Sequence, residues 1–127
     1  MNSFNFSDEV KWARKNGAPI VALESTIISH GLPRPKNLEI AKEIENTVRG
    51  IGAVPATIAM LNGVVHVGLE EAELLEIATS DAVTKASVRD LAILAQQKRH
   101  AATTVAATSH IAQEAGISIF ATGGLGG

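Results

Sequence analysis

Three stretches of the chain are mainly apolar over a length typical of single β-strands, and the first of them is continuously apolar. They run from Pro19 to Leu23, from Ala53 to Leu61 and from Ile117 to Ala121. A strand without polar alternation is buried on both faces, which is typical of a parallel sheet covered by helices. Asn62-Gly63 follows the second run and precedes Val64 to Val67, a pattern that predicts a β-hairpin.

Helical patterns separate these runs. Between residues 37 and 51 apolar side chains recur at intervals of three and four, and Glu45 and Arg49 have the spacing of an ion pair. The predicted helices cover residues 5–16, 37–51, 70–78, a segment that begins with the Ser87-x-x-Asp90 capping pattern, and a segment from Thr103 or Thr104 to Gly116. Strands that alternate with helices predict an α/β fold, a mostly parallel layered sheet flanked by helices, with residues 1–127 in a single domain.

Local signals also predict where the first two helices begin and end. Ser7 precedes two acidic residues and is the expected N-cap of the first helix, which Gly17 should end. Asn37 is the expected N-cap of the second helix. Within the first helix we expect Val10 and Trp12 to cover an edge of the core.

Composition and charge exclude several classes of function. The 127 residues are 46% hydrophobic and 19% charged, which is typical of a soluble globular protein. The formal net charge is −2, and the densest basic run is only Lys98 to His100, whereas nucleic-acid binding needs a clustered basic face. The absence of cysteine excludes disulfides and thiolate chemistry. We expect no membrane partner and, by default, a cytoplasmic location, because neither a signal peptide nor a membrane-length apolar run is found.

Polar groups gather where the predicted strands end. Glu24-Ser25-Thr26 follows the first apolar run, Thr122 and a series of glycines follow the last, and Lys85 lies just ahead of the helix that begins at Ser87. Ligands of open α/β sheets bind beyond the carboxyl ends of the strands. The pattern therefore places Glu24, Lys85 and Thr122 at or near the predicted ligand-binding edge.

Two of these residues each admit a functional and a structural interpretation. Glu24 would be partly desolvated at the end of a buried strand, which suits a carboxyl group to hold a proton at neutral pH. It can equally be a structural carboxylate that caps a backbone or pairs with Lys85. Lys85 can bind phosphate, neutralise an oxyanion or act as an amine nucleophile, but a solvated loop lysine is commoner.

Two further segments resemble anion sites without proving one. Ala102 to Ala106 offers backbone N–H groups and the hydroxyls of Thr103 and Thr104 at a helix start, but ordinary capping by Thr103 or Thr104 is the favoured interpretation. The glycines of residues 123–127 let a backbone approach a phosphate, but a dinucleotide fingerprint needs more residues than these. None of the four histidines has metal-ligand spacing, and we interpret them as surface or supporting residues. His30 is the exception of interest, because it follows the Glu24 segment in a loop rich in glycine and proline.

Five segments in this order closely resemble one family. They are VALESTIISHGLP, GAVPATIAMLNGVVHVGL, VTKASVRDLA, ATTVAAT and IFATGGLGG. Together they resemble the pseudouridine-5′-phosphate glycosidase family, also called the indigoidine synthase A family, over nearly everything after about Gly17. The resemblance implies an enzyme, a pseudouridylate synthase or glycosidase of the carbon–oxygen hydro-lyase class, that reversibly cleaves the C–C glycosidic bond of pseudouridine 5′-phosphate to uracil and ribose 5-phosphate.

The resemblance also implies roles for individual residues. Glu24 of ALEST matches the family's proton donor, and Lys85 of VTKAS matches its substrate-binding lysine. Val105 of ATTVAAT matches a substrate contact, which a valine can make through its backbone at a helix start. Thr104 beside it and Thr122 are expected to bind the phosphosugar.

The resemblance stops short of the family's other functional residues. Its metal-binding aspartate, expected beyond Gly127, and its imine-forming nucleophilic lysine have no counterpart in these residues, so the divalent metal, Mn²⁺ in the family, has no complete site here. We expect the fold to be incomplete relative to the family, apolar strand edges to favour self-association, and the family's homotrimer to be the oligomeric state. We predict that the chain alone is inactive. The alternatives are a non-catalytic phosphosugar- or nucleotide-binding module and a degenerate fragment without a stable fold.

Overall fold

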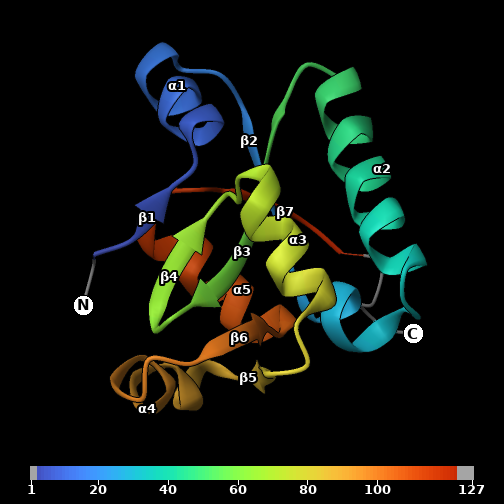
Figure 1. The fold of residues 1–127 in the computed structure, drawn as a ribbon. Helices are drawn as coiled ribbons and strands as arrows, with labels where there is room; N and C mark the ends of the chain where they lie inside the picture. The colour runs from blue at the N-terminus through green and yellow to red at the C-terminus, as the bar shows by residue number, and fades with distance from the viewer. Residues whose placement is uncertain (1–2, 123–127) are drawn as a thin grey trace.

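In the computed structural model, which describes residues 3–122, seven strands form one mixed sheet with helices on both faces (Figure 1). The strands are β1 (Asn5–Phe6), β2 (Ile20–Leu23), β3 (Val54–Leu61), β4 (Val64–Val67), β5 (Val83–Ala86), β6 (His100–Thr103) and β7 (Ile119–Ala121). The helices are α1 (Asp8–Asn16), α2 (Lys36–Gly50), α3 (Glu71–Thr79), α4 (Leu91–Gln96) and α5 (Val105–Glu114), with a π-helical turn η1 (Ile27–Gly31) and a 3₁₀ turn η2 (Val88–Asp90). The predicted α/β class is confirmed.

The sheet is mostly parallel, as predicted, and β3 is its central strand. Its main path runs β1-β4-β3-β2-β7, and β6 pairs with both β3 and β5. The β1–β4, β2–β3, β2–β7 and β5–β6 pairs are parallel, whereas β3 pairs antiparallel with β4 and with β6. The predicted hairpin is the β3–β4 pair, and Asn62 and Gly63 at its turn have φ of 50° and 81°. The antiparallel β3–β6 pair was not predicted, because its strands are far apart in the sequence.

Three strands were missed because each contains polar residues and none forms an apolar run. The β1 pair, Asn5 and Phe6, was predicted to be helical, but these residues pair with His66 and Val67. The other two missed strands, β5 and β6, have four residues each. Lys85 therefore lies near the carboxyl end of β5, as the pattern of polar groups indicated, and the alternative of a loop lysine is not observed.

The first helix begins and ends largely as predicted. Ser7 is its N-cap and accepts a hydrogen bond from the Val10 amide at 3.2 Å, and Gly17 ends it in the left-handed conformation at φ 70°. Val10 is fully buried, so its predicted core position is confirmed. Trp12 was wrongly placed in the core, because 57% of its surface is exposed.

Asn37 was predicted to cap α2, but it does not. The helix begins at Lys36, and Asn37 is buried within its first turn. Its side-chain amide donates to the carbonyl of Ile28 at 3.0 Å and to that of Ala78 at 2.7 Å. Asn37 therefore joins α2 to η1 and α3, a role that depends on contacts distant in the sequence.

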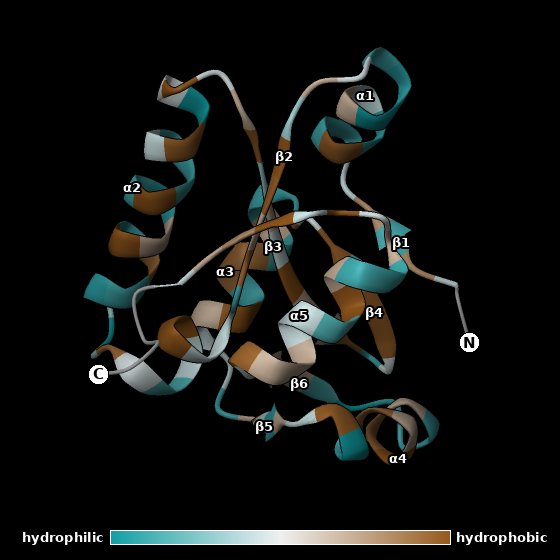
Figure 2. Cartoon of the chain, turned by 180° about the vertical axis from the view of Figure 1, so that it is seen from behind, coloured by the Kyte–Doolittle hydropathy of each residue, from teal (hydrophilic) through white to brown (hydrophobic). Residues whose placement is uncertain are grey.

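The core has a layer on each face of the sheet. Helices α1, α4 and α5 cover one face together with Ile58 and Met60 of β3, while α2, α3 and η1 cover the other face with Ala59 and Leu61. The two views agree that α3 and α5 lie on opposite sides of the sheet, and Figure 2 shows apolar residues concentrated along the central strands (Figures 1 and 2). None of the helices within residues 3–122 has the length and apolar character needed to span a membrane.

Candidate active site

The carboxyl ends of β2 and β6 meet at one residue of β3. Strand β2 pairs parallel with β3, and its last pair is Leu23 with Thr57. Strand β6 pairs antiparallel with β3, and its last pair is Ala102 with Ala59. The two strands therefore approach Ile58 from opposite directions along the same edge of β3. Because β2 and β6 both end there, the residues that follow them converge, although they are far apart in the sequence. This convergence explains why the apolar run of β2 stops at Glu24.

Glu24 is a buried carboxylate held by two hydroxyl groups. Only 7% of its surface is exposed. Thr122 Oγ1 donates to Glu24 Oε1 at 2.6 Å, and Thr26 Oγ1 donates to Oε2 at 3.3 Å. Thr122 reaches Glu24 because it follows β7, which pairs with β2 so that Leu23 faces Ala121. Among the described residues no ion pair joins Glu24 to Lys85, so the structural alternative of such a pair is not observed.

Glu24 and Lys85 nevertheless line the same open cleft. Its volume is about 470 Å³. Lys85 is an exposed residue of β5, and its neighbour across the β5–β6 pair is Ala102. The residues that line the cleft are Glu24, Thr26, Ile27, His30, Gly31, Lys85 and Val105. The predicted convergence of Glu24 and Lys85 is confirmed, and the cleft combines a carboxyl group with a cationic amine.

The start of α5 forms another wall of this cleft. Val105 is the first residue of the helix, and Thr104 is its N-cap, whose hydroxyl accepts a hydrogen bond from the Ala107 amide at 3.2 Å. The capping interpretation of Thr104 is therefore confirmed. Amides of a first helical turn have no carbonyl partner within the helix and attract anions. The α5 amides near Val105 therefore provide hydrogen-bond donors at the cleft that Lys85 also lines.

A second, smaller hollow lies on the other side of Glu24. It has a volume of about 250 Å³ and is mainly apolar, with Leu23, Ile27, Ile44 and Ala121 beside Glu24 and Thr122. Thr122 thus contacts the carboxylate directly and does not line the Lys85 cleft. The predicted phosphate-approach loop of glycines 123–127 lies outside the described residues.

Buried hydroxyl groups link the two strand ends at Ile58. Ser25 Oγ and Thr103 Oγ1 donate to the Ile58 carbonyl oxygen at 2.6 and 2.8 Å, and the Thr103 amide donates to Ser25 Oγ at 2.8 Å. Thr108 Oγ1 lies 2.7 Å from Thr103 Oγ1. The hydroxyl residues after β2 and the threonines before α5 were evident in the sequence, but no contact between them was predicted. Their only sequence signal is a cluster of small polar residues at both strand ends.

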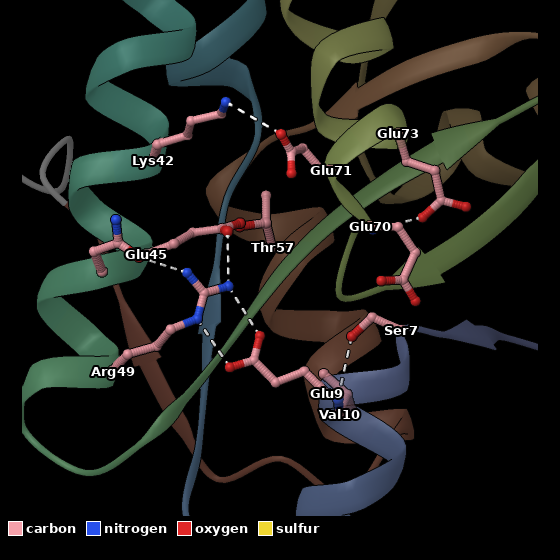
Figure 3. A network of polar contacts seen from close by, with 11 residues as sticks. Ser7, Glu9, Val10, Lys42, Glu45, Arg49, Thr57, Glu70, Glu71 and Glu73 are labelled. Atoms are coloured by element: carbon pink, nitrogen blue, oxygen red, sulfur yellow. Dashed lines mark hydrogen bonds and ion pairs between the residues drawn. The ribbon is translucent and has the colours of Figure 1, made fainter.

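A second polar network connects α1, α2 and β3 (Figure 3). Arg49 makes two hydrogen bonds of 2.9 Å to the carboxylate of Glu9 and one of 3.3 Å to Glu45, which confirms the predicted Glu45–Arg49 pair. Thr57 Oγ1 donates to Glu45 Oε2 at 2.7 Å. Burial raises the pKa of the Glu45 carboxyl above its ordinary 4.5, although the Thr57 hydrogen bond and the Arg49 charge oppose the shift. None of these side chains lines the Glu24 cleft. The network therefore connects α1, α2 and β3 and is not part of the candidate site.

The histidines occupy different environments. His30 is exposed at the cleft, whereas His66 is only 7% exposed and is therefore not a surface residue. Burial lowers the pKa of His66 below 6.5, and Glu73, 3.4 Å away, partly opposes the shift. Within residues 3–122 no three His, Asp or Glu side chains cluster as a metal ion requires.

Comparison with known proteins identifies relatives over the whole length of the chain. The model of the family described as indigoidine synthase A like protein matches residues 9–127. The pseudouridine-5′-phosphate glycosidase of Salinispora tropica is 63% identical over 119 residues, which are 94% of this chain and 37% of that protein. The enzyme of the same name from Geobacillus kaustophilus is 54% identical over 128 residues, covering 100% and 42%. The chain thus spans about two fifths of the length of these curated relatives.

Solved structures show the same fold. An indigoidine synthase A-like protein from Thermotoga maritima superposes with a TM-score of 0.85 at 30% identity, covering 100% of this chain and 41% of that one. The prealnumycin C-glycosynthase AlnA, solved in complex with ribulose 5-phosphate, superposes with a TM-score of 0.84 at 40% identity, covering 98% and 40%. The resemblance found in the sequence is confirmed: the chain belongs to the family of indigoidine synthase A-like proteins.

Proposed function

We propose that these residues form part of an active site that cleaves the C–C glycosidic bond of pseudouridine 5′-phosphate, releasing uracil and ribose 5-phosphate. One observation carries the proposal: the buried Glu24 carboxyl group opens onto the same cleft as the Lys85 ammonium group and the start of α5 at Val105. The names of the curated relatives, and the ribulose 5-phosphate in the AlnA structure, support a phosphosugar substrate.

The reaction requires a proton at the leaving carbon. When the bond between the anomeric carbon and uracil breaks, its electron pair goes to the uracil carbon, which is a far worse leaving group than oxygen. A positioned acid must therefore supply a proton to that carbon. Glu24 takes this role as proton donor, and the hydroxyls of Thr122 and Thr26 hold its carboxyl group in one orientation. In the net reaction one water molecule is consumed: its hydrogen is found on the uracil carbon and its hydroxyl group on the anomeric carbon of ribose 5-phosphate.

The phosphosugar would bind on the cationic side of the cleft. Its phosphate carries negative charge, which the Lys85 ammonium group and the amides near Val105 attract. Thr104 contributes mainly by capping α5, which fixes those amides. Glu24 and Lys85 are both cleft residues, so the sugar would lie between the phosphate-binding side and the acid.

Several finer assignments are part of the same proposal and follow from the family resemblance. The nucleophilic lysine that forms an imine with the sugar, and the residues that hold a divalent metal, Mn²⁺ by resemblance, belong to polypeptide that the relatives have and the described residues do not provide. The chain alone is then inactive, and the complete enzyme is a cytoplasmic homotrimer.

Replacing the matching residues of the Geobacillus kaustophilus relative with this chain tests the activity. The chimera should release uracil from pseudouridine 5′-phosphate. The Glu24→Gln variant should lower kcat at least about 100-fold, as expected for loss of a general acid. Asn46→Ala, at an exposed residue of α2, is the control. An active chimera whose kcat is unchanged by Glu24→Gln would refute the assignment of the proton donor.

A non-catalytic phosphosugar-binding module is the second candidate, because the chain spans only about two fifths of its relatives and still contains the cleft. Titration of the 127-residue chain with ribose 5-phosphate distinguishes the candidates from a degenerate fragment. Binding that Lys85→Ala abolishes and Lys98→Ala preserves supports both candidates. Turnover by the chimera then selects the enzyme. A chain with neither a cooperative thermal transition nor binding is a degenerate fragment.

A further inference from the structure

The hydroxyl groups at the β2–β6 junction form a fully satisfied set of hydrogen bonds. Ser25, Thr103 and Thr108 have 0% of their surface exposed. Each hydroxyl has one proton to donate. Ser25 and Thr103 both donate to the Ile58 carbonyl. Thr108 Oγ1 lies 2.7 Å from Thr103 Oγ1 and 3.5 Å from the Thr103 carbonyl oxygen, so its proton has an acceptor within Thr103.

The Ile58 carbonyl needs side-chain donors because of the way the strands are paired. On one edge of β3 the pairing changes from β2 to β6 at Ile58, so the carbonyl there is served by side chains and not by a strand ladder. A buried carbonyl without a donor is costly, and the two hydroxyls remove that cost. The Ser25 amide also donates to the Thr103 carbonyl at 3.4 Å, so main chain and side chains join the same two segments.

Each member of the set is next to a site element. Ser25 directly follows Glu24, and Thr103 directly precedes Thr104, the N-cap of α5. Thr108 lies one helical turn further along α5 and bonds back to Thr103. A hydrogen bond restrains both distance and direction, whereas apolar packing is not directional. The set therefore restrains Glu24 relative to the amides at the start of α5.

We propose that Ser25, Thr103 and Thr108 are positioning residues that hold Glu24 and the start of α5 at one relative geometry. The inference about ligand binding rests on the proposed function, whereas the mechanical coupling does not. Loss of any one hydroxyl should loosen both segments, including the one that is distant in sequence.

Amide hydrogen exchange in the 127-residue chain tests the coupling without a ligand. Ser25→Ala should speed exchange at least about tenfold at the Ala107 and Thr108 amides, which are hydrogen-bonded to Thr104, since local opening becomes easier. Thr108→Val should do the same at the Ile28 and Ser29 amides, which donate to the Ser25 carbonyl. Thr57→Val is the matched control: it removes another buried threonine hydrogen bond, to Glu45, one residue from Ile58. The proposal is overturned if each variant affects only its own segment, or if Thr57→Val produces the same changes.

Binding of ribose 5-phosphate provides the second measurement. Thr103→Val should weaken binding at least about tenfold at a temperature where all variants are folded, and Thr103→Ser, which restores the hydroxyl, should recover affinity to within about threefold of the original chain. Equal affinities for Thr103→Val and the original chain contradict the positioning role. If the original chain does not bind but the exchange coupling is present, binding by this chain alone fails and the mechanical coupling stands.

Discussion

Replacement of Gly63 by alanine tests how closely two turns of the fold approach each other. Gly63 has φ +81°, and a Cβ atom there would lie 2.5 Å from the Ala95 carbonyl oxygen and 2.8 Å from the Lys98 Cα. Both are backbone atoms, one in the last turn of α4 and one in the turn between α4 and β6, so no side-chain rotation relieves the overlap. The Gly63 amide also donates to the Arg99 carbonyl at 2.9 Å, which holds the two turns together.

The expected loss of stability has two parts. A left-handed backbone costs a residue with a Cβ about 1–2 kcal/mol, and the stiffer unfolded chain returns about 0.4–1 kcal/mol. Overpacking against fixed atoms adds about 1–3 kcal/mol. Gly17 is the matched control, because it has φ +70° with nothing within 4 Å. Gly63→Ala should therefore lose about 2–4 kcal/mol and Gly17→Ala about 1 kcal/mol.

Thermal unfolding followed by circular dichroism measures the difference. In a chain of this size 1 kcal/mol corresponds to about 4 °C in Tm, so the expected decreases are about 4 °C for Gly17→Ala and about 8–16 °C for Gly63→Ala. Asparagine tolerates the left-handed conformation, so Gly17→Asn should recover most of the loss while Gly63→Asn should not. Equal decreases at the two positions would show that only backbone conformation matters and would refute the close approach.

Further predictions concern buried polar groups and pH. Asn37→Ala removes the donor to two carbonyls and should cost about 2 kcal/mol or more, whereas Thr47→Ala on the exposed side of α2 should change Tm by less than about 2 °C; similar decreases for both would count against the Asn37 contacts. The folded chain holds the Glu45 proton more tightly than the unfolded chain, since burial raises its pKa, so this group lowers stability as pH rises above 4.5. In Glu45→Gln that pH-dependent part should disappear from the Tm profile; an unchanged profile would contradict it. His66 has the opposite sign: burial lowers its pKa, so the folded chain binds this proton less tightly and stability should decrease as pH falls below 6.5. The decrease should be absent in His66→Gln, measured by urea unfolding at pH 7.5 and 5.5, and its persistence there would assign it to another group.

Much of the local structure was predictable because it depends on neighbouring residues. Ser7 and Thr104 cap helices through amides three residues away, and the Ser87–Asp90 pair forms the predicted capping box. The apolar runs became β2, β3 and β7. Burial on both faces was predicted correctly for β2 and β3 but not for β7, where Ile119 is 49% exposed. The family was also evident, because five ordered segments were present in the sequence.

Other features depended on contacts that no local pattern reports. Asn37 has the residue type of an N-cap, but the meeting of α2, η1 and α3 buries it and directs its amide to their carbonyls. Glu45 and Arg49 have the spacing of a surface pair, but packing against Thr57 buries the carboxylate. The hairpin turn by itself accounts for a glycine at position 63. The structure adds a second reason, because the backbone of Ala95 and Lys98 leaves no room for a Cβ atom there.

The candidate site divides in the same way. The sequence by itself determined which groups were chemically capable, Glu24 and Lys85 above all, and that they lie at or near strand ends. Only the tertiary structure decided that they share a cleft, because β6 runs antiparallel to β3 and ends at Ile58, where β2 also ends. A hydrogen bond across 78 residues of sequence joins Thr103 to Ser25, and it depends on the packing of the whole sheet, which no short segment encodes.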